Sequence, residues 1–492
     1  MLLLGLILAV DLTGTLRGPP ACIWVGWNVR ARVVSEVHAE VFRLVARYLI
    51  QTVEPRIVIL GGGFAAIAAA HALERALRPS EASITLISRE NFSLFTPMLP
   101  EVSSGALDVR HIVTPVRSQL RRTRFILGDI NAIDVAEQTV RFMHTLRGDD
   151  DTVCYDQLML ALGSTTSTFG LPGVAEHVFA LKTLEDAGIL RNRLMWLLEL
   201  ADSTGEDAER RALLTIVVVG GGFTGVETAG ELVELFRSVR GFYPNIRGDD
   251  ITIMLVEGGS VLLPGLPRKM GAYSARDLQR RGVEAVLGRQ VESADARGLT
   301  LAGGRRIETR TIVWSAGVQP SPFLKAADLP HGKHGAVLVN SDLSVVGRPG
   351  IWAVGDCASI PDGSGGTFPA TAQHAIREGP VAAGNIVATL RGQPTRPFRY
   401  FALGMMASLG AHKAVAQLPG NRVLTGFPAW FLWRTYYLSR LPGLDRKLRV
   451  AFDWTLELLF PRDIAELRVY SRRARSSAAE DAGLQPRDGL SG

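Results

Sequence analysis

The sequence predicts an α/β fold in which two parallel-sheet domains of one kind occur in tandem, followed by a smaller α/β region. A short apolar run, a glycine turn, a helical segment and a second apolar run occupy residues 57–87, and the same order returns at 213–256. Strand and helix signals reappear at 345–395, before an aromatic and basic segment at 396–475. Strands alternating with helices in this way are typical of parallel sheets covered by helices.

The first unit carries a glycine pattern suited to a dinucleotide. Its predicted elements are a strand at 57–60, a helix at 65–77 and a strand at 84–87. In the pattern Gly61-x-Gly63-x-x-Ala66, the first glycine permits a tight turn and the second lets the backbone approach a pyrophosphate. The small third residue lets the helix pack on the strand, and the helix N-terminus offers free N–H groups to the phosphates. We therefore expect a Rossmann-like dinucleotide-binding domain.

An acidic residue usually follows the second strand of such a unit and binds the ribose hydroxyls. Ser88 stands at that position, and Glu90 follows two residues later on the same face of the strand. Two interpretations remain open for Glu90, a replacement for the usual acid or a solvated charge.

The second unit, with a predicted strand at 213–219, has the complete pattern Gly220-x-Gly222-x-x-Gly225. Its further predicted elements are a helix at 226–239 and a strand at 251–256, with a polar surface loop at 202–212 before the unit. Glu257 ends the second strand, where a carboxylate accepts hydrogen bonds from a ribose. It would also repel a 2′-phosphate by roughly 4 kcal/mol at ~4 Å before solvent screening, which favours NADH over NADPH.

A third motif, Val354-Gly355-Asp356, follows a predicted strand at 351–353 and precedes a predicted helix at 370–390. An aspartate beside a glycine at a strand end suits a polyol hydroxyl.

At these motifs the sequence resembles the flavoproteins with two dinucleotide-binding domains, and within them the type II NADH:quinone oxidoreductases. The resemblance covers about residues 56–467 and rests on the segments 94–102, 220–232, 372–375 and 406–415, with 161–164 matching the close of the first half of the FAD domain. It implies that the first glycine motif and Gly355-Asp356 hold FAD, while an NAD domain is inserted in the FAD domain. The implied division is an N-terminal extension (1–54), an FAD-binding domain (55–170 and 326–395), an NAD(H)-binding domain (171–325), a membrane-associating region (396–475) and a disordered tail (476–492).

The resemblance also implies individual roles. Pro97 and Met98 would lie near the flavin ring, Glu227 would orient the hydride donor, and Gln373 would border the quinone. Where the family often has a second glutamine this chain has Arg377, which either bonds a quinone carbonyl or closes the site to quinones. Glu227 and Gln373 are the predicted catalytic residues, and Gln373 and Arg377 the predicted quinone site. The predicted FAD-binding residues are Gly61, Gly63, Phe64, Ala65, Ser88, Arg89, Pro97, Met98, Ala161, Gly163, Gly355 and Asp356. The predicted NAD-binding residues are Gly220, Gly222, Phe223, Thr224, Gly225, Glu227, Glu257 and Gly317.

The predicted activity is NADH oxidation through FAD with electron transfer to a membrane quinone, without proton pumping. Three alternatives stay open: a soluble acceptor such as ferredoxin or oxygen, an NADH-sensing flavoprotein with slow turnover, and sulfide:quinone oxidoreduction. The last would need a redox pair from Cys154 and Cys357. The three widely spaced cysteines, Cys22 included, argue against a disulfide framework or a zinc site, and no metal site is predicted.

The C-terminal region predicts contact with a membrane surface. Residues 396–492 contain 15 lysines and arginines against 8 acidic residues. Phe427, Trp430, Phe431, Leu438 and Leu441 fit one face of a helix among basic residues, which is typical of an interfacial anchor. A homodimer interface or a lid on the flavin domain is the alternative, and no motif favours nucleic acid. We expect a peripheral protein on the cytoplasmic face of the cell membrane.

The N-terminal extension begins with an apolar run at residues 1–10 that lacks a preceding basic segment and a good cleavage site. It is a poor signal peptide. A helix is predicted at about 35–51.

Overall fold

Seven strands form the first sheet of the computed structural model, which describes residues 54–401 and 404–466. Their order is β20-β8-β1-β2-β5-β6-β7. In that order the strands are Ile351–Ala353, Gln157–Leu160, Arg56–Leu60, Ser83–Ser88, Arg124–Asp134, Thr139–His144 and Asp150–Cys154. The first five run parallel, and β6 and β7 add an antiparallel extension. The carboxyl ends of β1, β2, β8 and β20 therefore meet at one edge of the sheet.

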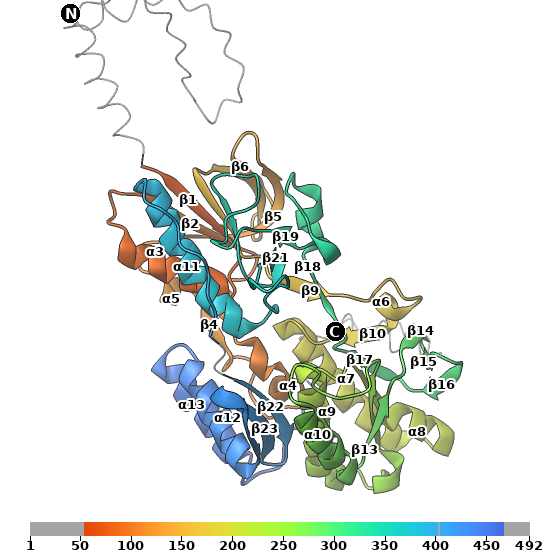
Figure 1. The fold of residues 1–492 in the computed structure, drawn as a ribbon. Coiled ribbons are helices and arrows are strands. Elements are labelled where there is room, and N and C mark those ends of the chain that lie inside the picture. The colour runs from red at the N-terminus through yellow and green to blue at the C-terminus, as the bar shows by residue number, and fades with distance from the viewer. Residues whose placement is uncertain (1–53, 402–403, 467–492) are drawn as a thin grey trace, which may run out of the picture.

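Two helices from distant parts of the chain cover one face of this sheet. Helix α3 (Phe64–Ala76) and helix α11 (Ala372–Leu390) lie side by side in Figure 1. Their approach is close, because a Cβ on Gly379 would collide with the backbone oxygen of Ala65. The segment after residue 350 thus completes the sheet and helix layer begun by residues 56–88, as the α/β prediction requires.

A second parallel sheet of five strands has the order β10-β17-β11-β12-β13. These strands are Val178–Ala180, Thr311–Trp314, Thr215–Val219, Thr252–Glu257 and Val283–Leu287. Its helices are α7 (Leu184–Ser203), α8 (Asp207–Leu214), α9 (Phe223–Val239) and α10 (Arg268–Arg280), and the antiparallel strands β14 (Val291–Asp295), β15 (Gly298–Leu301) and β16 (Arg305–Glu308) are attached. The predicted fold class, with two Rossmann-like sheets, is confirmed.

The predicted surface loop at 202–212 is wrong in part, because α8 begins at Asp207 and also takes Leu213 and Leu214 from the predicted strand. The polar residues lie on the outside of this helix, while its last apolar residues are buried. Arg210 fixes the preceding turn by donating to the carbonyl oxygens of Ala201 and Thr204. Amphipathic helical spacing over eight residues is easily mistaken for a polar loop.

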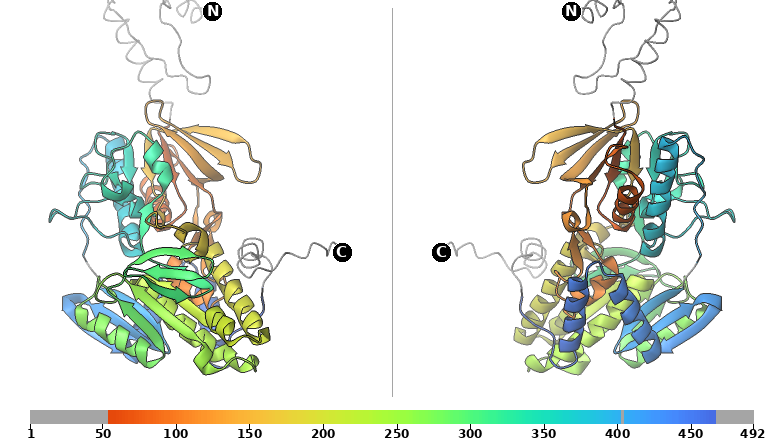
Figure 2. Two further views of the ribbon diagram at one scale, coloured as in Figure 1. Left: turned by 90° about the vertical axis from the view of Figure 1, so that its right-hand side faces the viewer. Right: turned by 90° about the vertical axis from the view of Figure 1, so that its left-hand side faces the viewer.

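The C-terminal region is an antiparallel sheet with two helices, as Figures 1 and 2 show in blue. It consists of β22 (Met405–Gly410), β23 (Lys413–Leu418), β24 (Arg422–Gly426), α12 (Phe427–Arg440) and α13 (Leu444–Leu456). Strand β22 packs against α9, where a Cβ on Gly230 would collide with the backbone oxygen of Leu409. This close fit fixes the region on the second domain.

Short elements complete the described part of the chain. They are β3 (Phe92–Leu94), β4 (Val113–Pro115), α4 (Leu99–Ser103), α5 (Val116–Gln119), β9 (Ser164–Thr166), α6 (Val174–His177), β18 (Val318–Pro320), β19 (Val337–Leu338), β21 (Ala358–Ser359) and seven short 3-10 turns. The antiparallel pair β9–β18 joins the segments that lead into and out of the second domain. One hydrophobic core lies under the first sheet, and a larger one combines α4, α7, α9 and the C-terminal region.

Several predictions concern residues outside those the structure describes. They are the leader at 1–10, the helix at 35–51, and the tail at 476–492. Among the described residues, no helix is both long and apolar enough to cross a membrane.

Candidate active site

Both glycine turns place a helix N-terminus over open space. Gly61 and Gly220 each have a φ of +112°, and a Cβ on either would strike the backbone of the neighbouring strand end. Gly63 and Gly222 start α3 and α9 in extended conformations, without a capping side chain. A Cβ at either position would meet no atom within 4 Å. The free N–H groups and the open cradle fit a dinucleotide pyrophosphate at each turn.

The predicted FAD-binding residues gather at the carboxyl edge of the first sheet. Ser88 lies directly beneath the first turn, because a Cβ on Gly62 would come within 2.6 Å of its hydroxyl oxygen. Asp356 accepts hydrogen bonds from Ser164 Oγ (2.6 Å) and Lys182 Nζ (3.3 Å). Ligands of parallel α/β sheets bind outside this edge.

The remaining predicted FAD residues have varied surroundings. Ala65 and Ala161 are buried, a Cβ on Gly163 would meet open space, and Gly355 has a φ of +71°. Arg89 is exposed and pairs with Glu90 at 3.6 Å, so Glu90 is engaged with its neighbour. Phe64 packs edge-on against Phe95, next to Pro97 and the fully buried Met98.

Four of the eight predicted NAD-binding residues line a separate pocket of about 570 Å³. Gly220, Gly222, Glu257 and Gly317 all contribute to its wall. Glu257 accepts from the backbone N–H of Gly221 (2.5 Å) and of Gly259 (2.6 Å), so its carboxylate is held beside the glycine turn. Phe223, Thr224 and Gly225 form the first turn of α9, and Gly225 is obligatory because a Cβ would collide with the oxygen of Gly220.

Glu227 is buried on the next turn of α9. Its Oε1 accepts from the backbone N–H of Ser408 on β22 at 3.0 Å. The pKa of Glu227 is raised to about 8 by burial and, to a smaller degree, by the nearby Glu231, against the opposing effect of this hydrogen bond. A carboxyl with this pKa holds its proton at neutral pH and can release it when a negative partner leaves or a base arrives.

Gln373 occupies the N-terminal turn of α11 with both ends of its amide engaged. Its Oε1 accepts from Tyr400 Oη (3.1 Å), and its Nε2 donates to the oxygen of Gly404 (3.3 Å). Arg377 donates to the backbone oxygen of Gln373 (2.6 Å), and its guanidinium lies over the Tyr400 ring. Arg377 therefore helps to hold Gln373 and its partner Tyr400 in place.

Strand β22 connects Glu227 with Gln373. Gln373 bonds Gly404, just before the strand, and Glu227 bonds Ser408 within it. At about 3.3 Å per residue, these contacts lie ~13 Å apart. The C-terminal sheet thus fixes both predicted catalytic residues from one side.

Comparison with known proteins shows the family of the chain. The family model of the pyridine nucleotide-disulphide oxidoreductases matches residues 55–379, and the NDH2 C-terminal domain matches residues 403–463. A type II NADH:quinone oxidoreductase of Mycobacterium tuberculosis, NdhA, is 34% identical, with 87% of this chain and 95% of the relative covered. The chain belongs to the type II NADH:quinone oxidoreductases. This family is a branch of the pyridine nucleotide-disulphide oxidoreductases, which bind FAD.

Other relatives extend the comparison. The demethylphylloquinone reductase NdbB of a Synechocystis species is 31% identical, over 81% of this chain and 95% of the relative. The solved structure of NDH2 from Plasmodium falciparum in complex with NADH has a TM-score of 0.78 and 20% identity, and covers 84% of this chain and all of that one. The second comparison shows the shared fold.

The sequence analysis missed two residues that the geometry brings to the site. Arg289 lines the second pocket beside Glu257, and only its basic character distinguishes it in the sequence. Glu378 on α11 accepts from the N–H of Gly355 at 2.6 Å. Burial raises the pKa of Glu378 to about 7, against the effect of that hydrogen bond. Its position within a helical segment gave no sign of this contact.

The cysteines do not form the redox pair that sulfide:quinone oxidoreduction would need. Cys154 is not bonded to Cys357, because Cys357 is a free cysteine. Cys357 is a free, fully buried thiol that donates to the oxygens of Leu160 and Val354. Burial raises the pKa of Cys357 to about 11, so it is unreactive at neutral pH.

Proposed function

We propose that this chain oxidises NADH through bound FAD and reduces a membrane quinone without pumping protons. The observation that carries the proposal is the pair of glycine turns, each with open space above a free helix N-terminus. The family of the chain and the quinone reductase activity in the names of its relatives support it.

The second pocket suits NADH. The first turn of α9 would hold the pyrophosphate and Glu257 would bind the adenosine ribose. Gly317 lines the same pocket and packs closely against the Phe169 ring, which a Cβ at position 317 would strike. Glu227 would orient the nicotinamide from the buried side of the same helix. Because Glu257 already bonds the turn through Gly221, it would place the ribose and phosphates relative to each other.

The carboxyl edge of the first sheet suits FAD. The N-terminus of α3 would hold the pyrophosphate, Ser88 the adenosine ribose, and Asp356 the ribityl chain. Pro97 and Met98 would border the ring. When bound, FAD supplies the chemistry that accepts a hydride and hands on two electrons.

Gln373 would meet the quinone on the side of the C-terminal sheet. Its amide is held by Tyr400 and Gly404, and the second hydrogen on Nε2 stays available to donate to a quinone carbonyl. The guanidinium of Arg377 lies over the Tyr400 ring, so Arg377 would act on the quinone site by holding Tyr400 in place.

Contact with the membrane would come from α13 and the segment after it. Leu444, Leu448 and Phe452 recur every four residues on one exposed face of α13, and Leu458, Leu459 and Phe460 continue this surface. Arg449 and Lys447 flank the face. Apolar residues beside basic ones suit an interface with anionic lipid. We therefore propose a peripheral position, on the cytoplasmic face of the membrane. Homodimer formation is a separate expectation.

The predicted apolar face of α12 is wrong in part. Phe427 and Phe431 are exposed, but Leu441 is buried against the core. The helix turns its middle residues onto the C-terminal sheet, so the outer surface belongs mainly to α13.

Anaerobic mixing of the purified, FAD-containing protein with NADH tests the function. We expect bleaching of the flavin absorbance, followed by fast recovery when a water-soluble quinone is added. Bleaching without recovery would overturn the quinone assignment and favour a soluble acceptor. Very slow turnover despite both steps would favour an NADH sensor, and absence of bleaching would refute NADH oxidation itself.

A further inference from the structure

A lysine of the second domain reaches the carboxyl edge of the first sheet. Lys182 lies between β10 and α7, within the segment predicted to bind NAD(H). Its Nζ donates to Ser164 Oγ at 2.8 Å and to Asp356 Oδ2 at 3.3 Å. Ser164 and Asp356 both belong to the predicted FAD domain. The second domain therefore places a cation beside the aspartate proposed to bind the ribityl chain.

Regular structure fixes the backbone on both sides of this contact. The backbone N–H groups of Lys182 and Thr183 both donate to Asp186 Oδ2, at 3.0 and 2.8 Å. Thr183 Oγ1 in turn accepts from the N–H of Asp186, which completes the capping box of α7. On the other side, Ser164 begins β9 and pairs with Pro320 of β18. Elements of both domains thus hold the lysine and its hydroxyl partner in place.

The contact leaves hydrogen-bonding capacity on both partners. The hydroxyl of Ser164 and the ammonium of Lys182 reach the same oxygen of Asp356, so Oδ1 stays available to accept from a ligand. An ammonium group has three hydrogens and two are used here, so Lys182 keeps one donor. The side chains of Lys182 and Asp356 are 32% and 19% exposed. A polyol hydroxyl can donate to the carboxylate and accept from the ammonium, so a ribityl chain fits this pair of groups.

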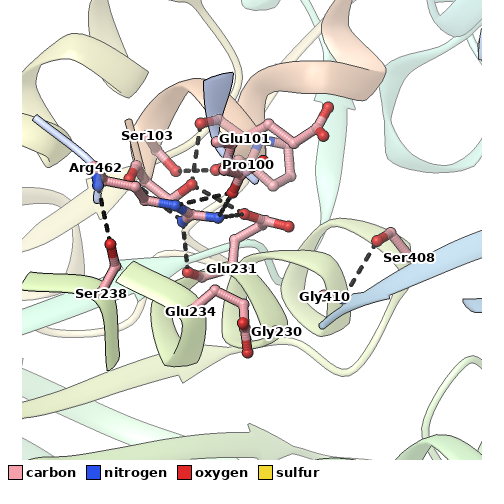
Figure 3. Close-up of polar contacts among 12 residues, drawn as sticks. Pro100, Glu101, Ser103, Gly230, Glu231, Glu234, Ser238, Ser408, Gly410 and Arg462 are labelled. Atoms are coloured by element: carbon pink, nitrogen blue, oxygen red, sulfur yellow. Dashed lines mark hydrogen bonds and ion pairs between the residues drawn. The ribbon is translucent and has the colours of Figure 1, made fainter. Parts of the chain in front are cut away.

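A buried ion pair elsewhere in the molecule provides a contrast. Arg462 Nη2 pairs with Glu231 Oε2 at 2.8 Å, and the backbone N–H of Arg462 donates to Ser238 Oγ at 2.9 Å. Figure 3 shows Arg462 and Glu231 converging among the helices, and their side chains are only 4% and 9% exposed. That pair is closed to solvent, whereas Lys182 and Asp356 lie at the edge of a parallel sheet where ligands bind.

Hydride transfer changes the charge of the flavin site. NADH leaves as NAD⁺, so the site receives two electrons and one proton and gains one negative charge. A carboxylate without a cation beside it would oppose this change, because like charges repel. The pair of Lys182 and Asp356 is neutral as a whole, so the opposition is largely removed.

We propose that Lys182 is a further residue of the FAD site. Its remaining N–H donates to a hydroxyl of the ribityl chain, and its charge offsets that of Asp356 and raises the midpoint potential of the flavin. A residue of the NAD domain thereby adjusts the cofactor of the other domain. This inference rests on the proposed place of FAD at the carboxyl edge of the first sheet.

The substitution Lys182→Gln tests the role of the charge. Glutamine keeps an N–H donor for Asp356 and Ser164 but carries no charge. We expect the protein to retain FAD, and the ratio of reduced to oxidised flavin at a fixed potential to fall about tenfold, which corresponds to a midpoint potential about 30 mV more negative. The measurement is an equilibrium titration of the flavin absorbance against a dye of known potential. Lys182→Arg, which keeps the charge, should have nearly the potential of the unsubstituted protein.

Lys413→Gln is the matched control. Lys413 of β23 pairs with Asp277 Oδ1 of α10 at 2.6 Å, so this variant also removes the cation of a lysine–aspartate pair, away from the carboxyl edge of the first sheet. It should leave the midpoint potential unchanged.

The outcomes separate the role of the charge from a structural role. Equal potentials in Lys182→Gln and the unsubstituted protein would overturn the inference, and so would the same shift in Lys182→Arg or in Lys413→Gln. If Lys182→Gln does not retain FAD, the affinity of the apoprotein for added FAD replaces the potential. Lys182→Arg should then bind FAD nearly as tightly as the unsubstituted protein, and equal loss of affinity in both variants would overturn the inference. Neither readout uses NADH or a quinone, so failure of the proposed function would appear in the turnover of the unsubstituted protein instead.

Discussion

Gly222 offers the sharpest test at the scale of a single residue. Its backbone is extended (φ −74°, ψ −169°), and a Cβ there meets no protein atom within 4 Å. Gly222→Val should therefore fold normally, while its side chain occupies the place proposed for the NADH pyrophosphate. We expect flavin bleaching to need about 100-fold more NADH, which corresponds to a loss of about 3 kcal/mol of binding free energy. FAD should still be bound.

Gly63→Val is the matched control, because Gly63 has the same geometry at the first turn (φ −82°, ψ −170°). This variant should lose FAD and keep its circular dichroism spectrum. Normal bleaching in Gly222→Val would show that NADH does not bind above α9.

Glu257 and Arg289 should act in opposite directions on cofactor choice. Both line the second pocket, where one would repel a 2′-phosphate and the other would attract it. Glu257→Ala should narrow the kcat/KM preference for NADH over NADPH by about tenfold once solvent screening is included. Arg289→Ala should widen the kcat/KM preference for NADH over NADPH. An unchanged ratio in Glu257→Ala would mean that this carboxylate does not face the ribose.

At the scale of elements, the sequence predicted what local backbone geometry imposes. Turns that need a positive φ at Gly61 and Gly220 leave a clear pattern, and both βαβ units followed from it. Helix α8 was missed because its polar outer face hides a short buried one. The exposed face of α13 was missed because its apolar residues repeat every four residues, as those of a core-facing stripe do, and only packing shows which side is covered.

Helix α13 is the element that should hold the protein to a membrane. Phe452 is 62% exposed at the centre of its outer face, whereas Trp454 on the other side is buried. Burying one such side chain is worth about 2 kcal/mol, so Phe452→Glu should reduce co-sedimentation with anionic vesicles by about tenfold or more. Turnover with a water-soluble quinone should not change.

Leu146→Glu is the matched control for α13, since Leu146 is also exposed but lies in the turn between β6 and β7. It should leave vesicle binding intact. Equal vesicle binding by Phe452→Glu and the unsubstituted protein would contradict the membrane proposal, and a change in oligomeric state would then assign this face to a second copy of the chain.

At the scale of the whole molecule, contacts between distant segments decide what the sequence could not. Arg462 lies 231 residues from its partner Glu231 and 358 from Ser104. No spacing rule connects such residues, and each alone resembles an ordinary surface charge. The roles of Gln373 and Arg377 were unresolved for the same reason, because Tyr400 and Gly404 reach them from a different segment.

The buried carboxyl groups should also make the stability of the whole protein depend on pH. The pKa values of Glu227 and Glu378 are raised by burial to about 8 and about 7, against 4.5 for an ordinary glutamate. The folded state therefore binds more protons than the unfolded state above pH 4.5. Their stabilising contribution is complete below that pH and is lost as the pH rises through 7 and 8.

Other groups leave a clear window between pH 6.5 and 8. The pKa of His374 is lowered by burial, so this residue adds stability only as the pH rises to about 6.5. Carboxylates with lowered pKa values, such as Glu74, are fully ionised in both the folded and the unfolded state between pH 6.5 and 8. We expect the free energy of unfolding in urea to fall by about 2 kcal/mol across this window because of Glu227, at about 1.4 kcal/mol per pH unit. Glu227→Gln, measured with saturating FAD, should reduce this slope, and the rest should come from Glu378 and Glu101, whose pKa values burial also raises. A slope equal to that of the unsubstituted protein would mean that Glu227 is ionised in the folded state.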